Sequence, residues 1–158
     1  MCEQISVDLP AATWYLALLE LFIHALVQRA PNSAHEETTI DNIRLATHEL
    51  CTNIIEHAYN GAEGRILMRL TLFMAPDRVV IETWDSAAPF DPTIVPLDPD
   101  IMGDRGRGLF LMRNLMDEVR YQARSNQSWV CNDGMQWQWV PPQGEQTPYN
   151  YWYMVKYL

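Results

Sequence analysis

The stretches RLATHELCTNIIEHAY (residues 44–59) and GDRGRGLFL (residues 103–111) decide how this chain folds. The first repeats apolar residues at helical spacing, and Glu49, Asn53 and His57 follow one another beside them at i, i+4 and i+8. The second is a glycine-rich loop that opens into another helix. A carboxylate and a carboxamide on one side of a helix, together with flexible glycines, indicate a nucleotide phosphate site with a magnesium ion.

The helix that holds the first stretch has its own start and stop signals. Asp41 can accept hydrogen bonds from the free N–H groups of a first turn, and Asn60 and Gly61 are left-handed residues that commonly end a helix. We therefore expect a helix over residues 42–59. Its carboxylate and carboxamide have no cationic partner four residues away, so a site is one interpretation and an ordinary polar flank is the other.

A strand and a long loop separate the two stretches. Residues 79–85 (VVIETWD) are rich in β-branched residues and end on a carboxylate, Asp85, at the mouth of a loop. The four prolines in residues 86–105 predict little regular structure there, and a long loop between core elements often acts as a lid. The end of this loop offers backbone N–H groups and positive charge to a phosphate, through Gly103, Arg105, Gly106, Arg107 and Gly108.

The glycine spacing by itself is not specific. No Gly-Lys-Ser/Thr follows it, so it is not a P-loop. It also follows a proline-rich loop rather than the tight turn after a first strand, so it is not a Rossmann fingerprint. The order of a helix with Glu and Asn, a strand ending in Asp, a loop and a glycine-rich helix start is much more specific than any of its parts.

This order resembles the GHKL ATPase superfamily and, within it, the small anti-sigma-factor serine kinases of bacteria. The resemblance covers most of residues 5–123. Residues 49–59 are similar to the family's N-box, residues 84–92 to its adenine-site box, and residues 103–113 to its second glycine box.

The resemblance implies a function and a role for each site residue. Glu49 would be the general base, Asn53 would coordinate Mg²⁺, and Asp85 would hydrogen-bond the adenine amino group of ATP. The loop with Gly103, Arg105, Gly106, Arg107 and Gly108 would fold over the phosphates. The implied partners are an anti-anti-sigma protein of the STAS type, phosphorylated on serine, and a sigma factor that the kinase holds.

One departure from the family pattern keeps a second function class open. The family usually has glycine two residues after the adenine-binding aspartate, where this chain has Ala87. Together with the aromatic residues near the C-terminus, it favours a nucleotide-responsive protein-binding module with little or no kinase activity. The intact Glu49 and Asn53 favour the kinase.

Composition limits the partners and the compartment. A net charge of −9 and a pI near 4.7, without a basic run, argue against a nucleic-acid partner. Three cysteines without a C-x-x-C pair predict neither a disulfide framework nor a zinc site, and so a reducing cytoplasm. The N-terminus does not read as a signal peptide, and Glu20 and His24 interrupt the apolar residues 14–27, which we expect to be a core helix rather than a membrane span.

The remaining patterns predict an α+β fold, a two-layer sandwich with helices on one face of a mixed, mainly antiparallel sheet. We expect a single domain over residues 1–158, with strands at 5–9, 65–73, 79–85, 118–124 and 149–158 and a helix after Pro10. An aromatic-rich hairpin insertion is expected at about residues 125–148, turning around Asn132, Asp133 and Gly134. Its aromatic residues either pack on the sheet or form a surface for a protein partner or a second copy, and the family resemblance leaves a homodimer open.

Overall fold

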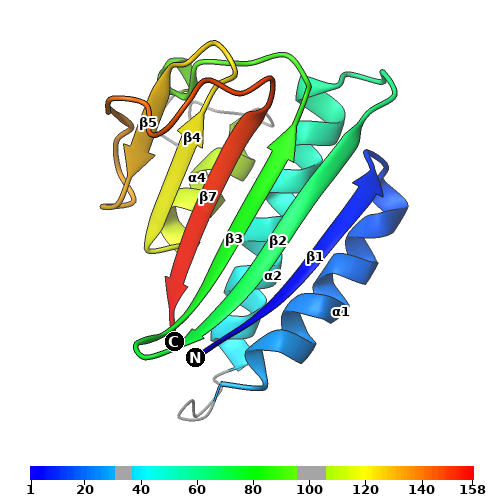
Figure 1. Cartoon of the computed structure of the whole chain (residues 1–158), viewed down its shortest axis with the longest axis vertical. Helices are drawn as coiled ribbons and strands as arrows, with labels where there is room; N and C mark the ends of the chain where they lie inside the picture. The colour runs from blue at the N-terminus through cyan, green and yellow to red at the C-terminus, as the bar shows by residue number, and fades with distance from the viewer. Residues whose placement is uncertain (31–36, 96–105) are drawn as a thin grey trace.

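The computed structural model describes residues 1–30, 37–95 and 106–158 of the chain. In these ranges one seven-stranded sheet, in the order β1-β2-β3-β7-β4-β5-β6, is covered on one face by helices α1, α2 and α4 (Figure 1). The elements are β1 (Cys2–Pro10), η1 (Thr13–Tyr15), α1 (Leu16–Val27), α2 (Glu37–Thr52), η2 (Asn53–Ala58), β2 (Arg65–Met74), β3 (Asp77–Asp85), η3 (Pro92–Ile94), α4 (Arg107–Leu115), β4 (Glu118–Gln122), β5 (Ser128–Cys131), β6 (Gln138–Trp139) and β7 (Asn150–Tyr157).

Strand pairing follows the hydrophobic pattern of the sequence. The hairpin β2–β3 closes at Met74 opposite Asp77, where the sequence predicts a turn. The C-terminal strand β7 inserts between β3 and β4 and places Asn150 opposite Asp85. Every pairing among the described strands is antiparallel, and the predicted two-layer α+β sandwich is confirmed.

The core lies between the sheet and the helices. Alternate residues of β2 point toward the helices, and the buried residues of α2 recur at helical spacing, as an amphipathic strand and helix require. Each fully buried aliphatic side chain stabilises the fold by about 1.5–3 kcal/mol. The main contributors from these two elements are Ile40, Ile43, Leu50, Ile66, Met68, Leu70 and Leu72, all less than 5 % exposed.

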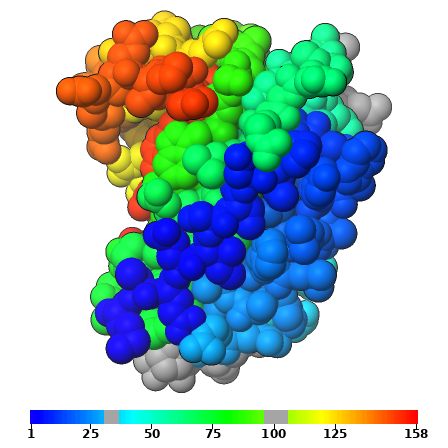
Figure 2. Space-filling model, turned by 45° about the vertical axis from the view of Figure 1, so that its right-hand side comes forward, coloured from blue at the N-terminus to red at the C-terminus, as the bar shows by residue number. Residues whose placement is uncertain are grey.

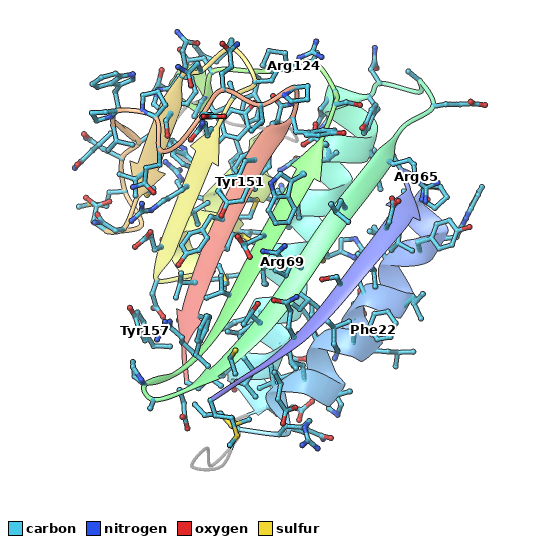
Figure 3. The ribbon with its side chains drawn as sticks, in the orientation of Figure 1. Phe22, Arg65, Arg69, Arg124, Tyr151 and Tyr157 are labelled. Atoms are coloured by element: carbon cyan, nitrogen blue, oxygen red, sulfur yellow. The ribbon has the colours of Figure 1, made fainter. Side chains whose placement is uncertain are left out.

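The opposite face of the sheet has no helix over it in the described ranges. Tyr151 and Arg69 project from this face toward the viewer in Figure 3. The Tyr151 hydroxyl donates to Glu82 at 2.8 Å, and the Arg69 guanidinium lies 5.1 Å from the ring centroid of Trp84. Polar and cation–π contacts between side chains therefore cover this face of the sheet.

The helix boundaries differ from the prediction at the N-terminal end. Helix α2 begins at Glu37, so Asp41 does not cap it but lies within it, with its carboxylate 3.2 Å from Arg44. Asn60 and Gly61 have φ of 49° and 85°, which confirms the predicted left-handed end. After Thr52 the helix continues as a wider π-helix, η2, over Asn53–Ala58. Such widened turns often occur at functional positions.

The hairpin β5–β6 ends the sheet, with Trp129 opposite Trp139. The segment around residues 128–148 projects at the end of the molecule away from β1 and α1, which form the near side in Figure 2. That residues 1–158 form a single domain, and that about 125–148 is an insertion into it, stay predictions. None of the helices in the described ranges combines the length and the apolarity needed to cross a membrane.

Tyr59 ties the end of η2 to the sheet. Its hydroxyl donates to the Arg65 carbonyl at 2.8 Å and accepts from the Ser86 N–H at 3.1 Å. Gly64 lies against this ring so closely that a Cβ there would be 2.1 Å from a ring carbon. The glycine therefore lets one aromatic residue join the helix end, the start of β2 and the residue after β3.

We expect Gly64→Ala to lower the free energy of unfolding by about 1–3 kcal/mol, because the added methyl overlaps the buried Tyr59 ring. Urea denaturation measures the change. In a Tyr59→Ala background the same substitution should cost much less, since the overlapping ring is gone. An equal loss in both backgrounds would contradict the steric explanation.

Candidate functional site

A cavity of about 500 Å³ lies where η2, the loop after β3 and the start of α4 meet. This volume is in the range of small-molecule sites. Its lining comes from residues far apart in the sequence: Asn53, Ile54, Glu56, His57, Ala58, Asn60, Asp85, Ala88, Pro89, Phe90, Val95, Gly106, Leu109, Tyr121, Asn150 and Trp152.

Asp85 is a buried acceptor at one end of this cavity. It is the last residue of β3 and only 2 % exposed. Its Oδ1 accepts from the Ala87 N–H at 3.0 Å and from Asn150 Nδ2 at 2.9 Å. Desolvation by burial raises the pKa of the carboxyl against these hydrogen bonds. Within the described residues both hydrogen bonds go to Oδ1, which leaves Oδ2 to accept from an N–H donor of a ligand.

Asn150 orients this carboxylate, and sequence reasoning missed it. Its Nδ2 donates to Asp85 and also to the Ala87 carbonyl at 3.0 Å. Its Oδ1 accepts from the Tyr121 hydroxyl at 3.3 Å and from the Arg124 N–H at 3.1 Å. Because its oxygen accepts two hydrogen bonds and its nitrogen donates two, the orientation of the Asn150 amide group is fixed. The available signal was a polar residue at the start of the last predicted strand, but only the strand register places it opposite Asp85.

Three aromatic rings, packed on one another, line the same cavity as Asp85. Phe90 and Tyr121 are stacked with ring centroids 4.9 Å apart, and Tyr121 lies 4.4 Å from Trp152. All three line the cavity. An aromatic lining suits a planar heterocycle, whose faces are apolar and whose edge carries hydrogen-bonding groups.

Helix α4 meets α2 at the other end of the cavity. A Cβ on Gly108 would lie 2.7 Å from Glu49 Oε2 and 3.0 Å from Asn53 Nδ2. Only glycine allows this approach, which gathers the predicted base and the predicted metal ligand around the first turn of α4. Gly106, before that turn, lines the cavity and has a φ of 91°, a conformation that favours glycine.

The structure places the remaining predicted residues differently. Arg107 is exposed, and like Glu49 and Gly108 it is not among the residues that line the cavity. Gly103 and Arg105 lie outside the described residues.

Ala87 fits its position. It is 4 % exposed, and only Asn60 and Asn126 have a positive φ among the described non-glycine residues. The alanine therefore needs no left-handed backbone, and its N–H and carbonyl join the hydrogen bonds around Asp85 and Asn150.

These residues fit an adenine nucleotide. A buried acceptor, Asp85, and aromatic rings line the cavity, and so does Gly106 at the start of α4. For Mg²⁺, the Asn53 side chain offers a carboxamide oxygen. The described residues contain no group of three His, Cys, Asp or Glu side chains able to hold a metal ion, so phosphates and water would complete its oxygen shell.

Comparison with known proteins gives the family. The family model for the histidine kinase-like ATPase domain matches residues 9–132. A serine-protein kinase RsbW of Bacillus pumilus is 31% identical over 135 residues, covering 78% of this chain and 80% of the relative. The serine-protein kinase RsbW of Bacillus subtilis is 29% identical over 131 residues, with the same coverage. The chain thus belongs to the GHKL superfamily of histidine kinase-like ATPases and, within it, to the small serine kinases that its sequence resembles.

Proposed function

We propose that the protein is an ATP-dependent serine/threonine-protein kinase that acts as an anti-sigma regulatory factor. It phosphorylates a serine of an anti-anti-sigma partner of the STAS type and otherwise holds a sigma factor. The observation that carries this proposal is the convergence of Glu49 and Asn53 on Gly108, beside a cavity that both Asn53 and Asp85 line. The serine-kinase names of its relatives support it.

Each residue has a task in binding. Asp85 accepts a hydrogen bond from the 6-amino group through the oxygen left free by Asn150. Phe90, Tyr121 and Trp152 pack beside the base. Asn53 holds the metal through its carboxamide oxygen, and the start of α4 presents N–H groups to the phosphates. When bound, ATP supplies the phosphoryl group and Mg²⁺ offsets its negative charge.

Glu49 is the general base of the transfer step. Its carboxylate takes the proton of the partner's serine hydroxyl as the serine oxygen bonds to the γ-phosphorus. The bond from that phosphorus to the bridging oxygen breaks, and ADP keeps the electron pair. Glu49 is half-buried beside Gly108, so the base stands at the phosphate end and not at the adenine end.

A nucleotide-responsive binding module without kinase activity is the second candidate. The exposed Trp139 and Met135 of the hairpin β5–β6, at 63% and 66% exposure, favour it because exposed apolar residues suit a protein partner. Incubation with labelled ATP, Mg²⁺ and candidate partners separates the two. Label on a partner serine supports the kinase, and nucleotide-dependent binding without label supports the module.

We also propose that the protein is located in the cytoplasm and that its partners are proteins rather than nucleic acid. The three cysteines are free, and burial raises the pKa of the Cys51 thiol to about 12, so this thiol stays protonated at neutral pH. Both features agree with a reducing cytoplasm. The net charge of −9 agrees with protein partners and against direct binding of nucleic acid.

We expect Glu49→Gln to keep ATP binding and to lower phosphotransfer by about 10²–10⁴-fold, because the volume is kept and only the base is lost. Asn53→Ala should instead weaken Mg²⁺-dependent ATP binding itself. Calorimetry and transfer of labelled phosphate measure the two effects. Turnover equal to wild type in Glu49→Gln would defeat the assignment of the base.

Gly108→Ala should fold normally but lose most phosphotransfer, because its methyl would displace both Glu49 and Asn53. Gly144→Ala serves as the control, since nothing lies within 4 Å of its Cβ position and its φ of 78° makes the replacement costly for stability only. Unfolding midpoints and phosphotransfer are measured together. Full activity in Gly108→Ala would show that the close approach is not needed.

Asp85→Asn should weaken ATP binding by about 10–100-fold, since an amide N–H₂ group would replace the free acceptor oxygen. Burial raises the pKa of Asp85 in the folded protein. The free energy of unfolding therefore falls as the pH rises above the pKa that this carboxyl has in the unfolded chain. The substitution should therefore leave stability at neutral pH equal or higher. Calorimetry at neutral pH and thermal unfolding check both parts, and a variant that binds ATP as wild type does would refute the role of Asp85.

A further inference from the structure

A chain of contacts runs from the hairpin β5–β6 to the nucleotide cavity. The ring of Trp129, which is 4 % exposed, lies nearly parallel to the ring of Tyr121, with centroids 5.9 Å apart and planes 10° apart. Tyr121 is 1 % exposed and also touches Trp152 and Phe90. Tyr121 is therefore enclosed by three rings, one of which comes from the hairpin.

The hydroxyl of Tyr121 is the polar end of this stack. It donates to Asn150 Oδ1 at 3.3 Å and accepts from the Phe90 N–H at 3.4 Å. The other half of the Asn150 amide donates to Asp85. One hydroxyl thus contacts both the loop that follows the adenine-site strand and the amide that orients the acceptor.

We propose that Tyr121 is a positioning residue for adenine recognition and that the hairpin β5–β6 holds it in place through Trp129. The hydroxyl keeps Asn150 in the orientation that presents Nδ2 to Asp85, so that the second oxygen of Asp85 faces the cavity. This inference rests on the proposed function, because it assumes that Asp85 reads the 6-amino group.

A second contact fixes the hairpin from the side of α4. Arg113, which is 3 % exposed, donates from Nη1 to the Met135 carbonyl at 2.7 Å. A Cβ on Gly134 would lie 3.3 Å from the Arg113 carbonyl, so the hairpin turn packs closely on the helix. With its turn held on α4, β5 can keep Trp129 against Tyr121.

The test compares two nucleotides that differ at one group. ATP carries the 6-amino donor, and purine riboside triphosphate lacks it. We expect wild type to bind ATP more tightly. Tyr121→Phe keeps the stacked ring and removes only the hydroxyl, and it should weaken ATP binding by about three- to tenfold while leaving the affinity for purine riboside triphosphate within about twofold. Calorimetry with Mg²⁺ measures both affinities.

The two tryptophans of the hairpin form a matched pair for the second part of the proposal. Trp129→Leu removes the ring that packs on Tyr121, whereas Trp139→Leu changes its partner across the hairpin, which is 63% exposed. We expect Trp129→Leu to reduce the ratio of the affinity for ATP to the affinity for purine riboside triphosphate. Trp139→Leu should leave this ratio unchanged. In a double-mutant cycle Trp129→Leu and Tyr121→Phe should be non-additive, since both act through one hydroxyl.

The outcomes distinguish this inference from the function on which it rests. A wild-type protein without preference between the two nucleotides would overturn the adenine-reading role of Asp85, and this inference with it. A wild-type preference that Tyr121→Phe retains would overturn the inference alone. Equal weakening of both nucleotides would also overturn it, because that result shows general loss of packing rather than loss of positioning.

Discussion

The burial of one carboxylate is the constraint on which the site depends. Asp85 is placed at the end of a central strand, away from water, and a charge there is costly unless hydrogen bonds hold it. Asn150, 65 positions later in the chain, donates a hydrogen bond to this carboxylate and so offsets part of the cost. Because the C-terminal strand β7 inserts beside β3 rather than at the sheet edge, Asn150 reaches Asp85 directly.

The two ends of the cavity are built in different ways. The end at Asp85 consists of strand residues and packed rings, whose positions the sheet register determines. The end at Asn53 lies beside two helices that approach across Gly108, and one of them continues as a π-helix from Asn53. The arrangement therefore combines one part whose geometry is fixed by strand register with another whose geometry is fixed by the packing of two helices.

The sequence predicted the elements well and their long-range neighbours poorly. Periodicity located the helices and the β2–β3 hairpin, because local spacing determines which face is buried. The predicted start of α2 was wrong. Aspartate is a common N-cap residue, but Asp41 lies inside the helix and pairs with Arg44. Asn150 and Tyr121 could not be found, since no local pattern records that β7 lies between β3 and β4. Glu49, Asn53 and Asp85 could be named beforehand because their order along the chain is characteristic, although their roles stay predictions.

Helix α4 has a mechanical consequence for the molecule. Its nine residues form a stiff rod about 13 Å long. Near its beginning Gly108 abuts Glu49 and Asn53, and near its end the Arg113 guanidinium grips the Met135 carbonyl. One short helix thus contacts Glu49 and Asn53 near its beginning and, near its end, the hairpin whose Trp139 and Met135 are exposed to solvent. A rigid-body shift of this helix would therefore displace both sets of contacts together.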